Sequence, residues 1–221
     1  MAKVAIVTGG SSGIGRAIIK SLRDIDWKVI APSRADINLA NLDDVTKASE
    51  KLAGELDKVD ALIHVAGVWH DESAVHANKD LEDFTPQQIA DTIAVGLTSF
   101  MIIAAKFLPK LAKDGAVIGI TGTFADGSSG WLPYYTSKRA QEDFLVGLAQ
   151  DYPSGPRVFG ISPADTATDA YKKFYPQYAD QAQSPEAIAS LCLQLVTGQG
   201  HHQNGDIIEI RNGMMTKGYH V

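Results

Sequence analysis

The chain is poor in cysteine: Cys192 is the only one among its 221 residues. A lone cysteine excludes an internal disulfide. It lies within an apolar helical pattern made by Ile188, Leu191, Leu195 and Val196. We therefore expect Cys192 to pack in the core of the fold rather than to carry redox chemistry.

Positive charge is scarce as well. Lysine and arginine number 20 against 26 aspartates and glutamates, which gives a formal net charge of -6. Without a basic stripe to neutralise phosphates, the sequence argues against a nucleic-acid partner. Long apolar runs are also missing: the N-terminal run soon ends in glycines, unlike a signal peptide, and no window suggests a membrane span. We expect a cytoplasmic protein with no membrane partner.

What is present is the composition of a globular protein, with 45% hydrophobic and 21% charged residues. The length suits a single domain over residues 1–221. Predicted strands and helices alternate along this whole length. The strands are expected near residues 3–8, 27–33, 59–65, 115–121, 156–161 and 206–210, and the helices near 14–25, 43–56, 86–112, 134–150 and 185–198.

This alternation predicts an α/β fold with a Rossmann-type, doubly wound parallel sheet of about six to seven strands and helices on both faces. Segments 59–65 and 115–121 are almost continuously apolar, as expected for strands buried on both faces. Two irregular segments, 68–84 and 163–184, follow strand ends. We expect both to border a ligand and to select the substrate.

The first predicted strand runs into a glycine-rich turn that opens a helix, with the pattern Thr-Gly-x-x-x-Gly-x-Gly. Gly9 would make the tight turn, Gly13 would let backbone approach a pyrophosphate, and Gly15 would let the helix lie close to the strand. Backbone N–H groups at a helix N-terminus attract anions. We therefore expect a dinucleotide site in this turn. Its other expected members are Ser11, Ser12 and Ile14.

Several motifs together resemble the short-chain dehydrogenase/reductase family over essentially the whole chain. Beside the glycine turn, they are Ala66-Gly67, similar to Asn-Asn-Ala-Gly; residues 134–138, similar to Tyr-x-x-Ser-Lys; residues 162–168, similar to Pro-Gly-x-x-x-Thr; and residues 204–213, similar to the last strand. His64 and Val65 replace the two asparagines. The resemblance implies an oxidoreductase that interconverts a carbonyl and a secondary alcohol by hydride transfer, and a homodimer or homotetramer that pairs through the two long helices.

Tyr134 and Lys138 carry the catalytic part of this resemblance. At i and i+4 of one helix they share a face, and a nearby ammonium should lower the pKa of the phenol from about 10. In the family the tyrosine is the acid and base, and the lysine also binds the nicotinamide ribose. For the serine that binds the substrate oxygen, Thr121 has the expected spacing and Thr123 is the alternative. Gly122 could equally occupy the position of this serine.

One departure from the family pattern bears on turnover. The family carries an asparagine in the long helix that supports a water-linked proton relay, and here Gly96 stands between Val95 and Leu97. Either a water molecule replaces the missing amide, or the relay is absent and turnover is slow. The alternative function is therefore a catalytically weak or inactive NADP(H)-binding sensor or interaction protein.

The residues after the second predicted strand favour NADP(H) over NAD(H). No acidic residue ends this strand, whereas Ser33 and Arg34 offer a hydroxyl and a guanidinium that suit a 2′-phosphate. Asp36 and Ile37 resemble the pair that lies against adenine in the family, which would require a helix and most of a strand to be deleted between. The resemblance adds further cofactor contacts at Ala66, Gly67, Tyr134, Lys138, Pro163, Ala164, Thr166 and Thr168.

No metal site is expected. Several titratable residues share one irregular segment, namely His70, Asp71, Glu72 and His76. Their spacing matches no compact ligand set. Trp69 and His70 could instead touch the substrate, a small carbonyl or alcohol compound. The resemblance implies that an aromatic-rich segment after Thr168 closes over this substrate. An amphipathic lid helix that packs on the body of the protein is the alternative for this segment, and the two are compatible.

Overall fold

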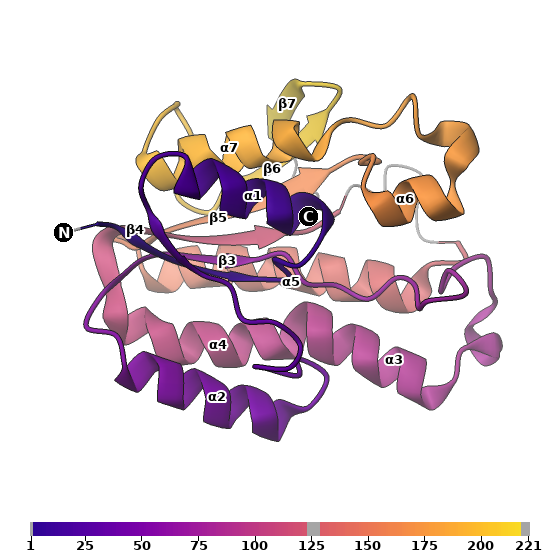
Figure 1. The fold of residues 1–221 in the computed structure, drawn as a ribbon, viewed down its shortest axis with the longest axis horizontal. Helices are drawn as coiled ribbons and strands as arrows, with labels where there is room; N and C mark the ends of the chain where they lie inside the picture. The colour runs from indigo at the N-terminus through magenta and orange to yellow at the C-terminus, as the bar shows by residue number, and fades with distance from the viewer. Residues whose placement is uncertain (1, 123–128, 218–221) are drawn as a thin grey trace.

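The sheet has the architecture that the strand pattern predicts. The computed structural model describes residues 2–122 and 129–217, and within them the strands form one seven-stranded sheet in the order β2-β1-β3-β4-β5-β6-β7 (Figure 1). All neighbouring pairs are parallel except β6 and β7. The expected doubly wound α/β fold is confirmed. The strands are β1 (Val4–Thr8), β2 (Lys28–Ile30), β3 (Val59–His64), β4 (Leu111–Ile120), β5 (Arg157–Pro163), β6 (Ile207–Arg211) and β7 (Met214–Lys217).

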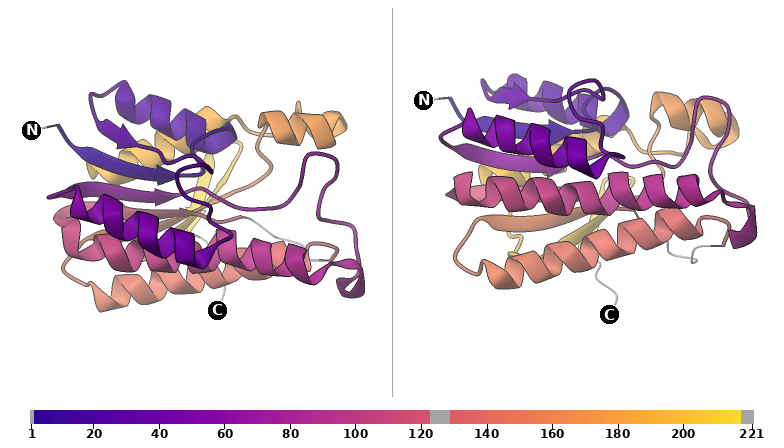
Figure 2. Two further views of the ribbon diagram at one scale, coloured as in Figure 1. Left: turned by 60° about the horizontal axis from the view of Figure 1, so that its bottom comes forward. Right: turned by 90° about the horizontal axis from the view of Figure 1, so that it is seen from below.

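Helices cover both faces of the sheet (Figures 1 and 2). On one face lie α1 (Gly13–Arg23) and α7 (Pro185–Thr197), and on the other lie α2 (Leu42–Gly54), α3 (Pro86–Ile93), α4 (Ser99–Phe107) and α5 (Leu132–Asp151). A π-helical turn, Ala94–Thr98, joins α3 and α4 into one helix. Short 3-10 turns occur at Leu81–Asp83, Leu108–Lys110 and Pro176–Tyr178, and α6 (Asp169–Phe174) lies beyond the end of the sheet.

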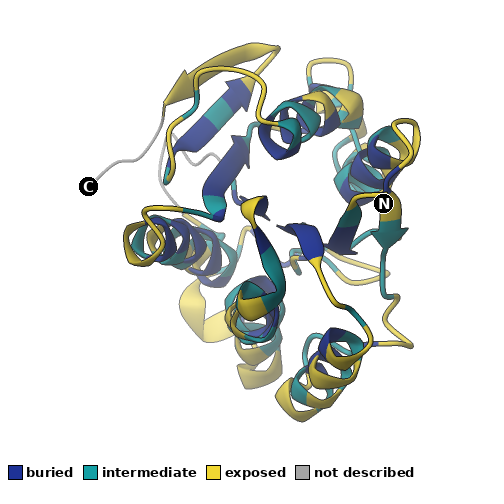
Figure 3. Cartoon of the chain, turned by 90° about the vertical axis from the view of Figure 1, so that its left-hand side faces the viewer, coloured by how far each residue is buried: buried dark blue, intermediate teal, exposed yellow. Residues whose placement is uncertain are grey.

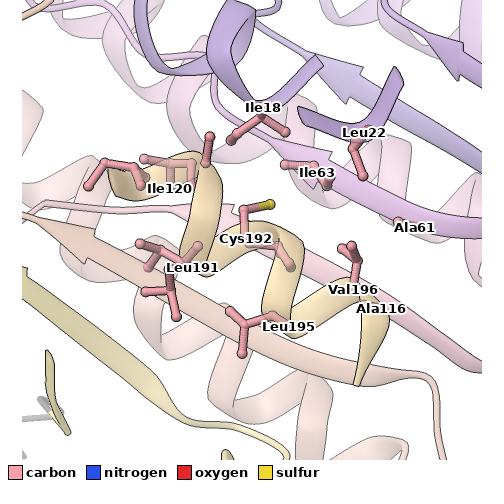
Figure 4. Close-up of a cluster of buried hydrophobic side chains, with 14 of the residues drawn as sticks. Ile18, Leu22, Ala61, Ile63, Ala116, Ile120, Leu191, Cys192, Leu195 and Val196 are labelled. Atoms are coloured by element: carbon pink, nitrogen blue, oxygen red, sulfur yellow. The ribbon is translucent and has the colours of Figure 1, made fainter. Parts of the chain in front are cut away.

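Two hydrophobic clusters, one on each face of the sheet, hold these layers together. Successive strand residues point to opposite faces, so Leu62 packs with residues of α2, α4 and α5 while Ile63 packs with those of α1 and α7. Figure 3 shows the central strands buried and the outer faces of the helices exposed. Cys192 lies in the cluster with Ile63, close to Ile18 (Figure 4). Burial raises the pKa of its thiol to about 12, which agrees with a packing role.

Three strands differ from the sequence prediction. β4 begins at Leu111, four residues before the expected start, so the end of the predicted helix 86–112 belongs to this strand. β2 ends at Ile30, before the expected end at residue 33, because Pro32 has no N–H to donate to a neighbouring strand. β7 is absent from the predicted strands, since all of its residues are exposed and show no apolar alternation. Asn212 and Gly213 join it to β6 with φ values of 49° and 78°. Positive φ at both positions is typical of a tight hairpin, so the Asn-Gly pair was its sequence signal.

The loops place two irregular segments at one end of the sheet. Between β2 and α2, residues 31–41 form only turns. This short connection fits the expected deletion of a helix and most of a strand. Segments 68–84 and 163–184 follow β3 and β5, and Figure 2 shows them extending at the same end of the sheet. The second contains α6, in the segment for which a lid helix was considered without bounds. The Thr168 side chain caps this helix by accepting from the backbone N–H of Tyr171 at 3.1 Å.

The helix Pro86–Lys110 corrects one expectation. By length and mean hydropathy, 1.7 over an 18-residue window, it would suffice to cross a membrane, although no such window was expected from the sequence. Within the fold 44% of that window is buried, and the side chains of Phe100, Ile103 and Phe107 belong to the core. Its position between α2 and α5 accounts for the apolar character (Figure 2).

Candidate active site

A large cavity opens at the carboxyl ends of the strands. Its volume is about 1300 Å³, more than the roughly 300–1,000 Å³ of a site for one drug-sized ligand. Thr8, Val65, Ile120 and Pro163 line it from the ends of β1, β3, β4 and β5. Strand order reverses at β1, which has β2 on one side and β3 on the other. Ligands of doubly wound sheets bind at such a switch point.

The turn between β1 and α1 admits only glycine at its closest contacts. A Cβ on Gly9 would lie 2.6 Å from the backbone N of Ala66, and one on Gly15 would lie 2.1 Å from the carbonyl O of Gly9. Gly13 has a φ of +48° and faces the methyl group of Thr168. The N-cap residue of α1 makes no side-chain cap, and no acidic residue stands in its first turn. The first N–H groups of α1 are thus arranged as in a phosphate site.

Tyr134 and Lys138 meet beside Gly67. The Lys138 Nζ lies 5.5 Å from the centre of the Tyr134 ring. A Cβ added to Gly67 would lie 3.3 Å from Lys138 Nζ and 3.4 Å from Tyr134 Cε2, so a larger residue there would crowd both side chains. Lys138 is 2% exposed, and its ammonium donates to the carbonyl O of Ile120 at 2.6 Å. The pair therefore lies on one face of α5 and lines the cavity.

Burial sets the protonation of this pair. It raises the pKa of Tyr134 and lowers that of Lys138 to about 8, while the charge of Glu142 acts in the opposite direction on Lys138. The structure thus corrects the expected lowering of the Tyr134 pKa. The reason is that the phenol loses hydration, whereas the ammonium is directed to the carbonyl of Ile120. At neutral pH the phenol stays protonated.

Thr121 is held by a residue that the sequence reasoning missed. Its hydroxyl donates to Glu142 Oε1 at 2.9 Å and lies 3.3 Å from a carbonyl O of β5. The Glu142 side chain is 2% exposed, is paired with Arg139, and burial raises its pKa. The available signal was spacing, because Glu142 follows Lys138 at i+4 and shares its face of α5. Thr123, the alternative to Thr121, lies outside the described residues.

His64, which replaces an asparagine of the family pattern, is held as a neutral ring. Its Nε2 lies 3.1 Å from the carbonyl O of Val95 and its Nδ1 lies 2.8 Å from Thr8 Oγ1. Because a carbonyl can only accept, Nε2 carries the hydrogen and Nδ1 accepts from the Thr8 hydroxyl. The ring stacks on Phe100 with centroids 4.6 Å apart. Burial, together with the charge of Lys138, lowers the pKa of His64 to about 3.

Gly96 lies in the π-helical turn, pressed against α5. A Cβ at Gly96 would lie 2.2 Å from Ser137 Oγ, and the Gly96 carbonyl accepts from Gln141 Nε2 at 3.0 Å. Ser137 Oγ is buried and makes no hydrogen bond among the described residues. A side chain at Gly96 would therefore require the Ser137 hydroxyl to turn away, while Ser137 Cβ would lie at an ordinary contact distance of 3.5 Å. The absence of an asparagine side chain at position 96 thus coincides with close packing of the π-helical turn against α5.

The loop after β2 brings Arg34, but not Asp36, into the cavity lining. Asp36 Oδ2 accepts from the backbone N and the hydroxyl of Ser33 at 2.8 and 2.7 Å, and these bonds lower its pKa. The Ser33 hydroxyl is thereby directed to a carboxylate. Ile37 is buried and lines the cavity. Arg34 is the positively charged residue that this loop contributes to the cavity lining.

The cavity brings together most residues that the sequence singled out. Its lining includes Gly9, Ser11, Ser12, Gly13, Ile14, Ser33, Arg34, Ile37, Ala66, Gly67, Thr121, Tyr134, Lys138, Pro163, Ala164, Thr166 and Thr168. Gly15 and Asp36 are not part of the lining, since Gly15 lies beneath the turn and Asp36 caps its own loop. Lining residues that the sequence reasoning had not singled out include Asp91, Trp131, Asp165 and Arg211.

The acidic loop after β3 is organised by its own hydrogen bonds. Asp71 Oδ1 accepts from the backbone N–H groups of Ser73 and Ala74 at 2.7 and 2.8 Å, and Asp71 Oδ2 lies 3.2 Å from His76 Nε2. Within residues 2–122 and 129–217, no three His, Cys, Asp or Glu side chains gather as a metal ion requires. Asp71 therefore acts as a turn cap in this structure.

A comparison with known protein families shows which family this chain belongs to. A family model described as short chain dehydrogenase matches residues 34–179. The chain belongs to the short-chain dehydrogenase family. This dehydrogenase is 24% identical over 247 residues to the 3-oxoacyl-acyl-carrier-protein reductase FabG of Aquifex aeolicus, covering 96% of this chain and 97% of that protein. It is 26% identical over 247 residues to the acetoacetyl-CoA reductase of Cupriavidus necator, with 96% and 98% covered.

Solved structures share the fold of this dehydrogenase. A short chain dehydrogenase from Burkholderia cenocepacia in complex with NADP has a TM-score of 0.79 and 24% identity, covering 96% of this chain and 97% of that chain. A 3-ketoacyl-(acyl-carrier-protein) reductase from Brucella melitensis complexed with NADH has a TM-score of 0.82 and 20% identity, with the same coverage. The protein is thus an oxidoreductase of a family that acts on CH–OH and C=O groups with NAD(P).

Proposed function

We propose that this dehydrogenase interconverts a carbonyl and a secondary alcohol with NADP(H), and that Tyr134 is the acid and base. The observation that carries the proposal is the convergence of Tyr134 and Lys138 beside Gly67, in the same cavity as the glycine turn. The turn fits a dinucleotide, because a Cβ at Gly9 or Gly15 would fill the cradle and the α1 N–H groups suit a pyrophosphate. A bound nicotinamide supplies or accepts the hydride.

The protonation of the site favours reduction. Burial keeps the proton on Tyr134, so the phenol can donate it to a carbonyl oxygen. As the proton leaves, the ammonium of Lys138 favours the phenolate that remains. Thr121 or Thr123 would hold the substrate oxygen, and for Thr121 this requires its hydroxyl to turn away from Glu142. In the proposed chemistry, Tyr134 and Lys138 thus carry out the proton transfer, and the threonine only orients the substrate oxygen.

Activity is tested by following NADPH oxidation with a panel of ketones, aldehydes, quinones and 3-oxoacyl thioesters. Turnover of any of these carbonyls supports the proposed function. Tight NADPH binding without turnover would overturn it in favour of a catalytically weak or inactive NADP(H)-binding sensor or interaction protein. Two observations favour this second candidate: Thr121 donates its hydroxyl hydrogen to Glu142, and Gly96, packed against the Ser137 hydroxyl, stands in place of the family asparagine.

Preference for NADP(H) is proposed on the guanidinium of Arg34, which is exposed in the cavity lining. Arg34→Ala should raise the KM for NADPH about tenfold or more and change the KM for NADH little, because a charge-assisted contact to the 2′-phosphate is lost. Arg23→Ala, at an exposed position on α1, is the matched control. A wild-type protein that prefers NADH, or an unchanged KM for NADPH in Arg34→Ala, would contradict the preference.

We also propose that one domain, residues 1–221, works in the cytoplasm as a homodimer or homotetramer paired through α4 and α5. Met101 supports this, since it is 45% exposed on α4. The support is smaller than the sequence suggested, because Phe100 and Phe107 of the same helix are buried in their own fold. Sedimentation equilibrium should give twice or four times the 23.7 kDa of one chain, and a monomer at micromolar concentration would contradict this pairing.

A further inference from the structure

Aromatic rings from separate segments of the chain meet at the candidate active site. Trp69 comes from the loop after β3, Trp131 from the residue before α5, and Phe174 and Tyr175 from the end of α6. We call these four residues the aromatic wall. The centroid of Trp69 lies 6.3 Å from that of Trp131, 6.0 Å from that of Phe174 and 6.5 Å from that of Tyr175. Such spacings are those of interacting aromatic pairs.

The aromatic wall leads to the proposed acid. The centroid of Trp131 lies 6.0 Å from that of Tyr134, so the rings form a continuous series that starts at the phenol. All members of the wall line the cavity, and each is half-buried. Apolar ring surface left open to a cavity gains free energy when a ligand covers it. A group attached to a carbonyl at Tyr134 would therefore lie against the aromatic wall.

Charges of both signs line the cavity beside the aromatic wall, so they favour neither an anionic nor a cationic substrate over an uncharged one. Asp71 lines the cavity in the same loop as Trp69, and hydrogen bonds within this loop lower its pKa, so that its carboxylate stays ionised. Lys173 donates to the carbonyl O of Glu72 at 2.6 Å and lies 4.9 Å from the centre of the Phe174 ring. This cation thereby ties the loop to α6.

We infer that the substrate is an uncharged carbonyl compound with an aromatic ring next to the carbonyl group, bound with that ring against the aromatic wall. The inference rests on the proposed function. Ring stacking at this wall would separate the protein from relatives named for thioester substrates, 3-oxoacyl-acyl-carrier-protein and acetoacetyl-CoA. An acyl thioester brings an anionic carrier and an aliphatic group next to its reacting carbonyl, and so gains no ring stacking from Trp69 or Trp131 at that position.

The test compares ketones that differ only in ring aromaticity. Affinities for acetophenone and for cyclohexyl methyl ketone are measured by calorimetry on the full chain with excess NADP⁺, and kcat/KM is measured with NADPH for both and for acetoacetyl-CoA. Wild type should favour acetophenone by about tenfold, the upper range for one aromatic pair. Trp69→Leu and Trp131→Leu keep an apolar side chain without a π face, and should bring the ratio close to one.

Tyr152→Leu is the matched control, because Tyr152 is an exposed aromatic residue at the far end of α5. This variant should keep the wild-type ratio. Equal affinities for the two ketones in wild type, or a higher kcat/KM for acetoacetyl-CoA, would overturn the inference while leaving the proposed function in place. An acetophenone preference in binding without turnover would support the wall and count against the proposed chemistry instead. Two separate leucine variants keep the test decisive if one of them fails to fold.

Discussion

Replacing His64 by asparagine should make the free energy of unfolding less sensitive to acid. The pKa of His64 is about 3 in the fold, against an ordinary value of 6.5 for a histidine side chain. Below pH 6.5 the unfolded chain therefore binds a proton that the folded chain excludes. Stability from this residue is complete above pH 6.5 and is lost as the pH falls toward 3. Between pH 7 and pH 5 the loss amounts to about 2 kcal/mol for this one group.

The physical origin of this effect is the closed surroundings of His64. The ring is fully buried, stacked on Phe100, and its Nδ1 already accepts from the Thr8 hydroxyl. A proton added at Nδ1 would remove that acceptor and place a charge in the core near Lys138, whose own charge lowers the pKa further. The hydrogen bond from Nε2 to the carbonyl of Val95 favours a positive charge on the ring, but burial and the charge of Lys138 outweigh it.

Urea unfolding followed by circular dichroism at pH 7 and at pH 5 measures the effect. Between pH 7 and pH 5, the free energy of unfolding should fall by about 2 kcal/mol more in wild type than in His64→Asn. His201→Asn changes an exposed histidine and should behave as wild type. A uniform loss of stability in His64→Asn, caused by the missing ring stack, does not alter this comparison. Equal losses in all three proteins would refute the argument that His64 is buried as a neutral group.

Two further predictions concern residues that pack on or belong to α5. Gly96→Asn should lower the melting temperature by overpacking against Ser137, with a loss of about 1–3 kcal/mol in the free energy of unfolding. Combining it with Ser137→Ala should restore most of this loss, and an unchanged melting temperature in Gly96→Asn alone would contradict the packing argument. Glu142→Gln should move the alkaline limb of the pH–rate profile to lower pH, because the charge of Glu142 raises the pKa of Lys138. Asp143→Asn changes an exposed position and should leave the limb in place. An unshifted limb in Glu142→Gln would contradict the effect of Glu142 on the pKa of Lys138.

The fold could be predicted where strands are buried on both faces. The apolar runs within β3 and β4 are short and rich in β-branched residues, as expected for parallel strands covered on both faces. β7 could not be predicted in this way, since its residues are exposed and it exists only by pairing with β6. Likewise, the apolar helix Pro86–Lys110 resembles a membrane span until its neighbours α2 and α5 are placed.

The site could be predicted where one element carries all of it. Tyr134 and Lys138 lie on one helix, so spacing alone placed them together. The direction of the Tyr134 pKa was missed, because it depends on burial, which other segments provide. Trp131 was missed for the same reason, since only the fold brings it to Trp69 from across the sequence. The pairing of Thr121 with Glu142 likewise joins a strand end to a helix.

The central claim is that Tyr134 delivers the proton in carbonyl reduction, and its most direct test is Tyr134→Phe. NADPH oxidation is measured for wild type, Tyr134→Phe and the neighbouring Tyr135→Phe on a carbonyl that wild type reduces, together with NADPH dissociation constants. The account predicts a fall of about 10²–10⁴-fold in kcat for Tyr134→Phe, with NADPH affinity nearly unchanged and Tyr135→Phe close to wild type. Turnover by Tyr134→Phe at the wild-type rate would contradict the claim.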